Sequence, residues 1–260
     1  MIKTILFVCL CTISFHSFSK DMLIGVNQRD IYRYQDEHGQ WQGKDIELIE
    51  ATFSHLPHTY KLVEMPWARI LKSLETGVID LTVSAAVTPE RSVYALFSTQ
   101  PYRYNHHMIF GIKDKLPLLK QVKTLPDIIN KDILLGVLRG AVYSDLYHDL
   151  LNNPEFSRHL IYFDNDQNMA DITLKGRVDA YIEAEIEGHY YLSKNPKYRE
   201  KIVPLIRITE GAQSASYLMF SKKTANKNLV SEFDNALQLL HSSGEYGQIS
   251  AKYKNTKTLF

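Results

Sequence analysis

The sequence predicts an α/β protein built from two lobes with a cleft between them. Short apolar runs alternate with amphipathic segments of about 10–15 residues, a pattern typical of βαβ units in a mostly parallel sheet. The same order of strand and helix then returns in the second half of the chain. Ligands of such sheets bind just beyond the carboxyl ends of the strands.

Residues 1–19 are expected to be a secretory signal peptide and not part of the fold. Lys3 precedes an apolar stretch at residues 5–13, which is too short to span a membrane and ends in small residues. Cys9 and Cys11 both lie in this segment, and neither is preceded by the small residue of a lipoprotein site. We therefore expect a soluble periplasmic protein without disulfides, thiol chemistry or a covalent anchor.

Charge and motif content exclude several kinds of partner. The chain has 30 basic and 29 acidic residues, and no basic block or stripe, so nucleic acid and anionic membrane are not expected partners. No HExxH helix, Cys/His cluster or acidic calcium loop occurs, so no metal or cofactor is expected. The adjacent His106 and His107 point to opposite faces of an extended chain, so they are read as ordinary residues beside a crossover.

The first half of the chain predicts three strands and two helices in alternation. Ile46, Ile49 and Phe53 recur at helical spacing before Pro57, and Gly77 is a natural C-cap for the helix before it. The expected strands are residues 20–26, 60–66 and 78–86, and the expected helices lie within residues 43–57 and 66–77.

The second half of the chain repeats this alternation of strands and helices. Residues 133–151 give a strand, a glycine turn and a helix, and residues 168–185 give a helix, a turn and a strand. In the two halves Gly77 corresponds to Gly176 and Asp80 to Asp179, and turn chemistry explains both aspartates. A C-terminal strand at residues 216–220 and a helix at residues 229–243 complete one of the two sheets.

Arg91 is the first candidate binding residue. Thr88 is the expected N-cap of a short helix and Pro89 its first residue, which puts Arg91 where a capping box has Glu or Gln. The helix dipole disfavours a cation there by a few tenths of a kcal/mol. We interpret Arg91 as a ligand for a carboxylate, which a guanidinium matches in a planar, bidentate way. The alternative is a solvated arginine paired with a nearby acid.

Other candidates have a structural interpretation beside the functional one. Trp67 fits the apolar stripe of its helix, which favours core packing over a place at the cleft rim. Glu183, Glu185 and Glu187 follow a strand and suit the first turn of a helix, although one of them can face the cleft as a cation ligand or a general acid. No nucleophile elbow, phosphate loop or cysteine nucleophile occurs, so no catalytic residue is expected.

Five stretches in order resemble the extracellular solute-binding proteins of family 3, the amino-acid-binding components of ABC importers. The stretches are GKDIELIEA, MPWARILKSLETGVIDL, TPERSVYALFSTQPY, GVLRGAVY and LKGRVDAYIEAE. The resemblance covers residues 21–253 and implies a type II periplasmic-binding fold with two crossovers between lobes. Lobe 1 is then expected at residues 20–108 plus 213–260, and lobe 2 at residues 109–212.

The resemblance also implies a ligand site. Arg91 would bind the ligand's carboxylate together with Ser84, with Ala86 at the second hydroxyl position of the family. The backbone N–H groups of Gly140 and Ala141 would reach it from lobe 2, and an aromatic ring from Tyr32 or Tyr34 would stack on the ligand. The aspartate that binds an α-ammonium in the family falls on Ala184, and Glu183 or Glu185 is the candidate substitute.

The resemblance implies a non-enzymatic periplasmic protein that captures a small carboxylate, an amino acid or a relative, for an ABC permease in the inner membrane. We expect a monomer. Two alternatives stay open at this point. One is a dehydratase of cyclic carboxylates on the same scaffold, with Glu183 or Glu185 as its acid. The other is a stand-alone sensing module.

Overall fold

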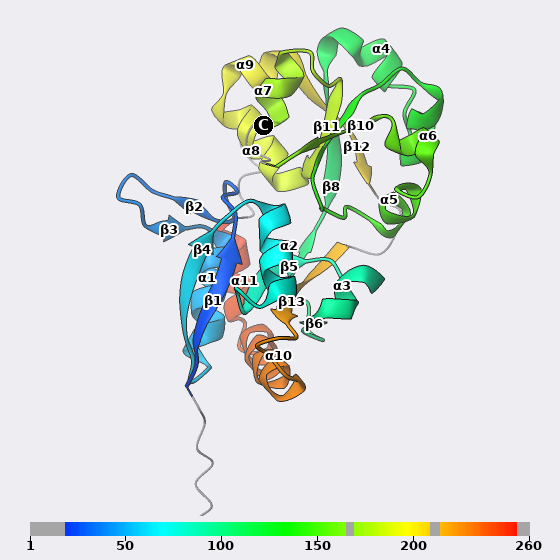
Figure 1. Ribbon diagram of the computed structural model, residues 1–260. Coiled ribbons are helices and arrows are strands. Elements are labelled where there is room, and N and C mark those ends of the chain that lie inside the picture. Colours follow the sequence, from blue (N-terminus) through cyan, green and yellow to red (C-terminus); the bar gives the residue numbers. More distant parts are fainter. Residues whose placement is uncertain (1–18, 165–168, 209–213, 254–260) are drawn as a thin grey trace, which may run out of the picture.

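Two α/β lobes lie one above the other in the structure, a computed structural model that describes residues 19–164, 169–208 and 214–253 (Figure 1). Each lobe contains one sheet covered by helices. The first sheet has the order β4-β1-β5-β13-β6, with β7 also paired to β13, and the second has the order β10-β9-β11-β8-β12. The two-lobed α/β fold predicted from the sequence is confirmed.

The first lobe is built from the two ends of the chain. Its strands are β1 (Asp21–Val26), β4 (Thr59–Glu64), β5 (Leu81–Ala85), β6 (Ala95–Phe97), β7 (Arg103–Asn105) and β13 (Ser214–Ser221). Its helices are α1 (Lys44–Ser54), α2 (Trp67–Thr76), α3 (Pro89–Tyr94), α10 (Lys227–Ser242) and α11 (Glu245–Lys252). A small hairpin, β2 (Tyr34–Gln35) and β3 (Trp41–Gln42), extends from its edge (Figure 1).

The second lobe is built from the middle of the chain. Its strands are β8 (His107–Ile112), β9 (Leu135–Leu138), β10 (Leu160–Phe163), β11 (Ala180–Ala184) and β12 (Ile202–Ile208). Its α-helices are α4 (Leu116–Leu119), α5 (Asp145–Leu150), α6 (Pro154–Ser157), α7 (Met169–Leu174), α8 (Glu185–Lys194) and α9 (Pro196–Lys201). Two 3₁₀ turns, η1 (Lys113–Lys115) and η2 (Leu125–Asn130), complete it.

The turns that contain Gly77 and Asp80 in the first lobe and Gly176 and Asp179 in the second have the same conformation and equivalent hydrogen bonds. Gly77 and Gly176 have φ angles of 81° and 70°, the left-handed conformation that a C-cap glycine adopts without steric cost. The Asp80 carboxylate accepts the backbone N–H of Leu23 at 2.8 Å, and Asp179 accepts that of Leu134 at 2.8 Å. Each carboxylate thus binds a backbone N–H that lies 57 or 45 residues away and not one of its own turn, so the interpretation of the two aspartates by turn chemistry is wrong. The repeat is one of architecture.

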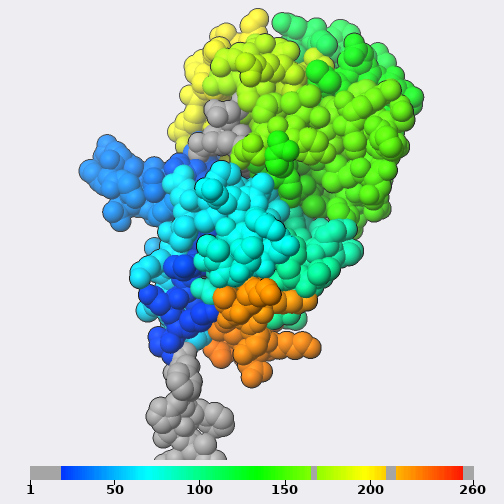
Figure 2. Space-filling view, viewed as in Figure 1, coloured from blue at the N-terminus to red at the C-terminus, as the bar shows by residue number. Residues whose placement is uncertain are grey.

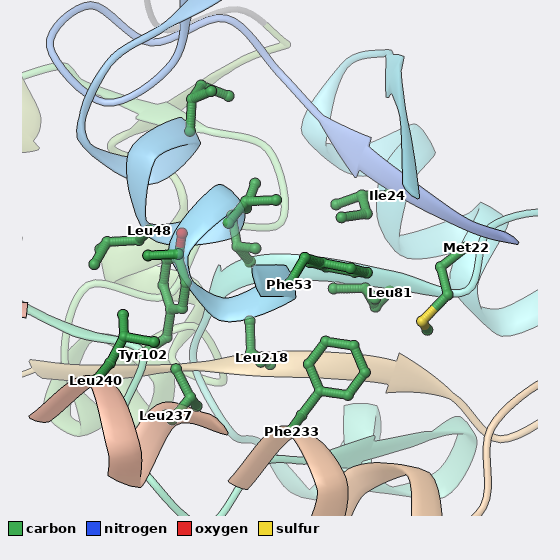
Figure 3. Close-up of a cluster of buried hydrophobic side chains, with 14 of the residues drawn as sticks. Met22, Ile24, Leu48, Phe53, Leu81, Tyr102, Leu218, Phe233, Leu237 and Leu240 are labelled. Carbon is green, nitrogen blue, oxygen red and sulfur yellow. The ribbon is translucent and has the colours of Figure 1, made fainter. Parts of the chain in front are cut away.

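The core of the first lobe lies where the sheet meets α1 and α10 (Figure 3). Met22 and Ile24 of β1 lie on one side of this cluster, and the rings of Phe53 and Phe233 meet edge-on with centroids 5.3 Å apart. Since β13 pairs with β5 and β6, the C-terminal strand and helix complete the first lobe and not the second. The sequence had left this choice open.

Both connections between the lobes run through neighbouring strands. β7 pairs with β13 in the first lobe, and the chain enters the second sheet at His107, where β8 begins. The expected boundary between residues 108 and 109 therefore falls inside β8. The other expected boundary, between residues 212 and 213, lies outside the described residues, as does the expected signal peptide apart from Ser19.

Because α8 lies close to β8, a methyl group added at Gly188 should lower the stability of the fold. A Cβ added to Gly188 would lie 2.1 Å from an atom of the Phe110 ring, whereas nothing lies within 4 Å of one added to Gly247 in α11. Gly188→Ala should lower the free energy of unfolding by about 1–3 kcal/mol through overpacking. Gly247→Ala should raise it by about 0.5–1 kcal/mol, since alanine is the better helix former. Urea unfolding of both variants tests this, and equal stabilities would contradict it.

Candidate ligand-binding site

A pocket opens between the lobes at the carboxyl ends of the strands. It holds about 670 Å³ of space, part of it open to solvent. Residues that follow β1 and β5 and the end of β7 line it from the first lobe. The start of β8, the end of β11 and the glycine turn after β9 line it from the second. The space-filling view shows the cyan segment that contains α2 against the green surface of the second lobe (Figure 2).

Arg91 lies buried at this pocket with carbonyl partners alone. Thr88 caps the helix as predicted, since its hydroxyl accepts the Arg91 backbone N–H at 3.2 Å. The guanidinium donates to the Ala86 carbonyl at 2.7 Å and to the Gly140 carbonyl at 2.6 Å. Among the described residues no carboxylate oxygen lies within 4.0 Å of it. Burial lowers the pKa of this guanidinium because the charged form has lost its water.

Trp67 joins Arg91 in a contact that crosses the cleft. Its indole N–H donates to the Gly140 carbonyl at 3.1 Å, and the Arg91 guanidinium lies 5.7 Å from the centre of its ring. The ring is 7 % exposed and also packs in the apolar cluster of α2. Trp67 is therefore both a core residue, through its packing in the cluster of α2, and a cleft residue, through its contact with Gly140.

Arg29, which the sequence analysis did not single out, forms an ion cluster across the cleft. Its guanidinium donates to Glu183 at the end of β11 and, through Nε at 2.9 Å, to Glu187 in α8. Both carboxylates are buried. The cluster holds two carboxylates against one guanidinium and joins the loop after β1 to the second lobe. No local sequence pattern predicts this cluster, because Arg29 is more than 150 residues away from each of the two glutamates.

Glu185 lies in a different environment from Glu183. Its carboxylate pairs with Arg207 at 2.5 Å, at the start of α8, and it does not line the pocket. Glu183 and Glu185 therefore pair with different arginines, and of the two Glu183 lines the pocket.

A second buried ion cluster supports the floor of the pocket in the first lobe. Asp45, fully buried, binds Arg33 and Arg103, the latter with Nε 2.9 Å from its carboxylate. Arg33 also donates to the side-chain oxygen of Asn27 at 2.6 Å. Because that oxygen is occupied, the amide NH₂ of Asn27 is the group that remains for other partners. Asn27 and Arg33 both line the pocket.

Ser84 has a strained backbone at the end of β5. Its φ of 63° is left-handed, a conformation that costs about 1–3 kcal/mol for a residue other than glycine and that clusters at binding sites. Its hydroxyl donates to that of Ser216 at 3.2 Å, which in turn donates to the Arg103 carbonyl at 3.1 Å. The strain places a serine hydroxyl and the Ala86 carbonyl at the pocket.

Asn105 and His107 line the pocket where the chain crosses between the lobes. The side-chain oxygen of Asn105 is buried and has no hydrogen-bond partner in the described structure. His107 Nδ1 lies 3.2 Å from the Tyr143 carbonyl. Burial, reinforced by the charge of Arg29, lowers the pKa of His107 to about 3. His107 is thus a pocket residue, a role that the sequence analysis did not give it.

Some of the predicted site residues line the pocket and others do not. Ser84, Ala86, Arg91, Trp67, Ala141 and Glu183 all line the pocket. The glycine turn differs from expectation: Gly140 presents its carbonyl to Arg91, and the Ala141 N–H donates to the Leu138 carbonyl at 3.0 Å. Tyr32 lies under Arg103, 3.9 Å from ring centre to guanidinium, and Tyr34 lies in the hairpin, so neither ring lines the pocket.

The described residues contain neither a metal site nor a membrane-spanning helix. No group of three or more His, Cys, Asp or Glu side chains within residues 19–164, 169–208 and 214–253 has the arrangement of a metal site. Across the same ranges, no helix combines the length and the apolar character that a membrane span needs.

The fold and the interlobe pocket define a protein of the periplasmic-binding class. Solved structures with this fold include an ancestral arginine-binding protein bound to arginine, with a TM-score of 0.75 and 22% identity over 90% of this chain and 98% of that one. A histidine kinase sensor domain with similarity to periplasmic binding proteins matches with a TM-score of 0.73 and 19% identity, over 90% and 96% of the two chains. At these identities the likeness shows the fold.

Residues 23–256 match the bacterial extracellular solute-binding proteins, family 3, and the chain belongs to that family. A curated relative is the ABC transporter arginine-binding protein 1 of Escherichia coli K12, 27% identical over 213 residues, or 81% of each chain. The family resemblance inferred from the sequence is confirmed. The protein is therefore a solute-binding protein.

The buried, neutral imidazole of His107 predicts acid sensitivity. The folded-state pKa of about 3 lies below the ordinary value of 6.5, so the unfolded state binds the extra proton first. The protein should therefore lose about 2–3 kcal/mol of unfolding free energy through this group between pH 6.5 and 4.5.

Urea unfolding across this pH range measures the loss. His107→Phe should flatten the slope by about that amount, and His106→Phe, at the neighbouring histidine that does not line the pocket, should leave it unchanged. Equal slopes in all three proteins would contradict the assignment.

Proposed function

We propose that this protein is a periplasmic amino-acid-binding protein that delivers its ligand to an ABC permease. The family membership supports an amino-acid solute, and the predicted signal peptide supports export. The arginine-binding relative from Escherichia coli makes arginine one of the first ligands to test. Such a permease would recognise the closed, ligand-bound form of the protein.

The observation that carries the proposal is the buried guanidinium of Arg91 without a carboxylate partner. A buried charge that has lost its water is costly unless an opposite charge or several hydrogen bonds stabilise it. Two carbonyls supply part of this stabilisation, one of them from the opposite lobe. A ligand carboxylate supplies the missing charge and accepts from both arms of the guanidinium.

The ammonium half of an amino acid has a charge partner in Glu183. This carboxylate lines the pocket and belongs to a cluster in which one arginine serves two glutamates. Glu183 thus places a carboxylate at the pocket, opposite in charge to the guanidinium of Arg91. A zwitterion with its carboxylate toward Arg91 and its ammonium toward Glu183 matches this polarity.

Ligand-driven closure follows from the division of the site between lobes. Arg91, Trp67 and Ser84 belong to the first lobe, and Glu183 to the second. A ligand that contacts both sets gains its full binding energy when the lobes are shut, and so it shifts the population toward the closed form.

Removal of the Arg91 side chain should weaken ligand binding severely. Arg91→Ala should cost about 2–5 kcal/mol of binding free energy, as for the loss of one partner of other buried charge pairs. Isothermal titration calorimetry with the best ligand of the screen below measures this. Arg69→Ala is the matched control, because Arg69 is exposed on α2 and does not line the pocket. A change of less than twofold in the Arg91 variant sinks the proposal.

A thermal-shift screen identifies the ligand. The twenty L-amino acids, L-ornithine, L-cystine and a set of small carboxylates without an amino group would each be added to the exported protein. A true ligand at a hundredfold its dissociation constant should add about 2.7 kcal/mol of stability. A screen in which no amino acid raises the melting temperature would rule out the proposed ligand class.

A further inference from the structure

The family resemblance places the residue that would bind an α-ammonium at Ala184, which has no polar side chain. His107 lies next to this position. In the antiparallel pair of β8 and β11, Ala184 is directly opposite His107. Side chains at opposite positions of such a pair lie on one face, with Cβ atoms about 4.5–5.5 Å apart. Ala184 is buried and does not line the pocket, so it offers no ligand group beside the imidazole of His107.

The lone pair of His107 is on Nε2. A carbonyl oxygen is an acceptor alone, so the contact of Nδ1 with the Tyr143 carbonyl, 3.2 Å long, requires the proton on Nδ1. The edge of the Tyr143 ring, with centroids 5.1 Å apart, holds the imidazole in this orientation. A neutral histidine in this tautomer has one acceptor, Nε2, and the side chain lines the pocket.

Asn105 supplies a second acceptor from the same side. It precedes His107 by two positions on extended chain, so the two side chains lie on one face, and both line the pocket. Its side-chain oxygen is buried without a hydrogen-bond partner in the described structure, and the residue is 9 % exposed. A buried polar atom of this kind costs about 1–3 kcal/mol unless a ligand satisfies it.

We infer that His107 Nε2 and Asn105 Oδ1 bind the ligand's α-ammonium as a pair of neutral acceptors, in place of an acid at position 184. Burial and the charge of Arg29 hold the pKa of His107 low, so its imidazole is neutral, and Arg29 itself pairs with Glu183 and Glu187. Glu183 supplies the opposite charge, and the two acceptors supply direction for the N–H donors. The inference rests on the proposed amino-acid ligand and names the residues that distinguish an amino acid from a plain carboxylate.

The test compares two probes on three variants of the full exported chain. One probe is the L-amino acid that stabilises the protein most in the screen, and the other is the same acid with hydrogen in place of its α-ammonium. Calorimetry gives both affinities for the wild type, His107→Phe and Asn105→Leu. His106→Phe is the matched control, since His106 is adjacent in sequence and does not line the pocket.

The wild type should prefer the amino acid to its deaminated counterpart. His107→Phe and Asn105→Leu should each weaken amino-acid binding about tenfold or more while the deaminated acid keeps its affinity within about threefold. Retained binding of the deaminated acid also shows that a variant is folded. Equal affinities of the wild type for both probes, or equal losses of both in the two variants, would overturn the inference.

A measurement on the wild type needs no substitution. In ¹⁵N spectra of the histidine side chains, the unprotonated Nε2 of His107 should shift when the amino acid is added and remain in place with the deaminated acid. An unchanged resonance with the amino acid contradicts the inference. Failure of the proposed function is distinguishable, because there Arg91→Ala would leave the affinities of both probes unchanged.

Discussion

The ion cluster of Arg29, Glu183 and Glu187 is the interaction on which the arrangement of the two lobes depends. It joins the loop after β1 to β11 and α8, and its carboxylates are buried. Removal of one partner of a buried pair leaves a charge without compensation, at a cost of about 3–5 kcal/mol. The cluster therefore stabilises this closed arrangement of the lobes at the edge of the pocket.

The other arginines at the pocket or beneath it fall into two kinds. Arg33 and Arg103 share Asp45 beneath the first-lobe loops, where they fix Asn27 and the ring of Tyr32. Arg91 has carbonyl partners and no carboxylate among the described residues. A count of arginines in the sequence does not separate these kinds. The separation depends on which guanidinium is next to a buried acid, and Asp45 is twelve residues from Arg33 and fifty-eight from Arg103.

Features encoded by neighbouring residues were predictable from the sequence. Thr88 and Pro89 predicted the start of α3, and Gly77 and Gly176 predicted the repeated helix ends, because caps depend on residues a few positions apart. The partners of Glu183 and the role of His107 were not predictable in this way. The first depends on a contact 154 residues long in sequence, and the second on the register between β8 and β11.

The carbonyl of Gly140 has a consequence for the rate at which a ligand enters. It accepts from both Arg91 and Trp67, so it occupies one of the donor positions that a carboxylate would use. Since it belongs to the same chain, it competes at a fixed effective concentration that does not depend on the amount of ligand. If a ligand carboxylate takes this donor, the turn has to withdraw first, and association would be limited by motion of the second lobe. At high ligand concentration the observed rate would then level off at the rate of that withdrawal.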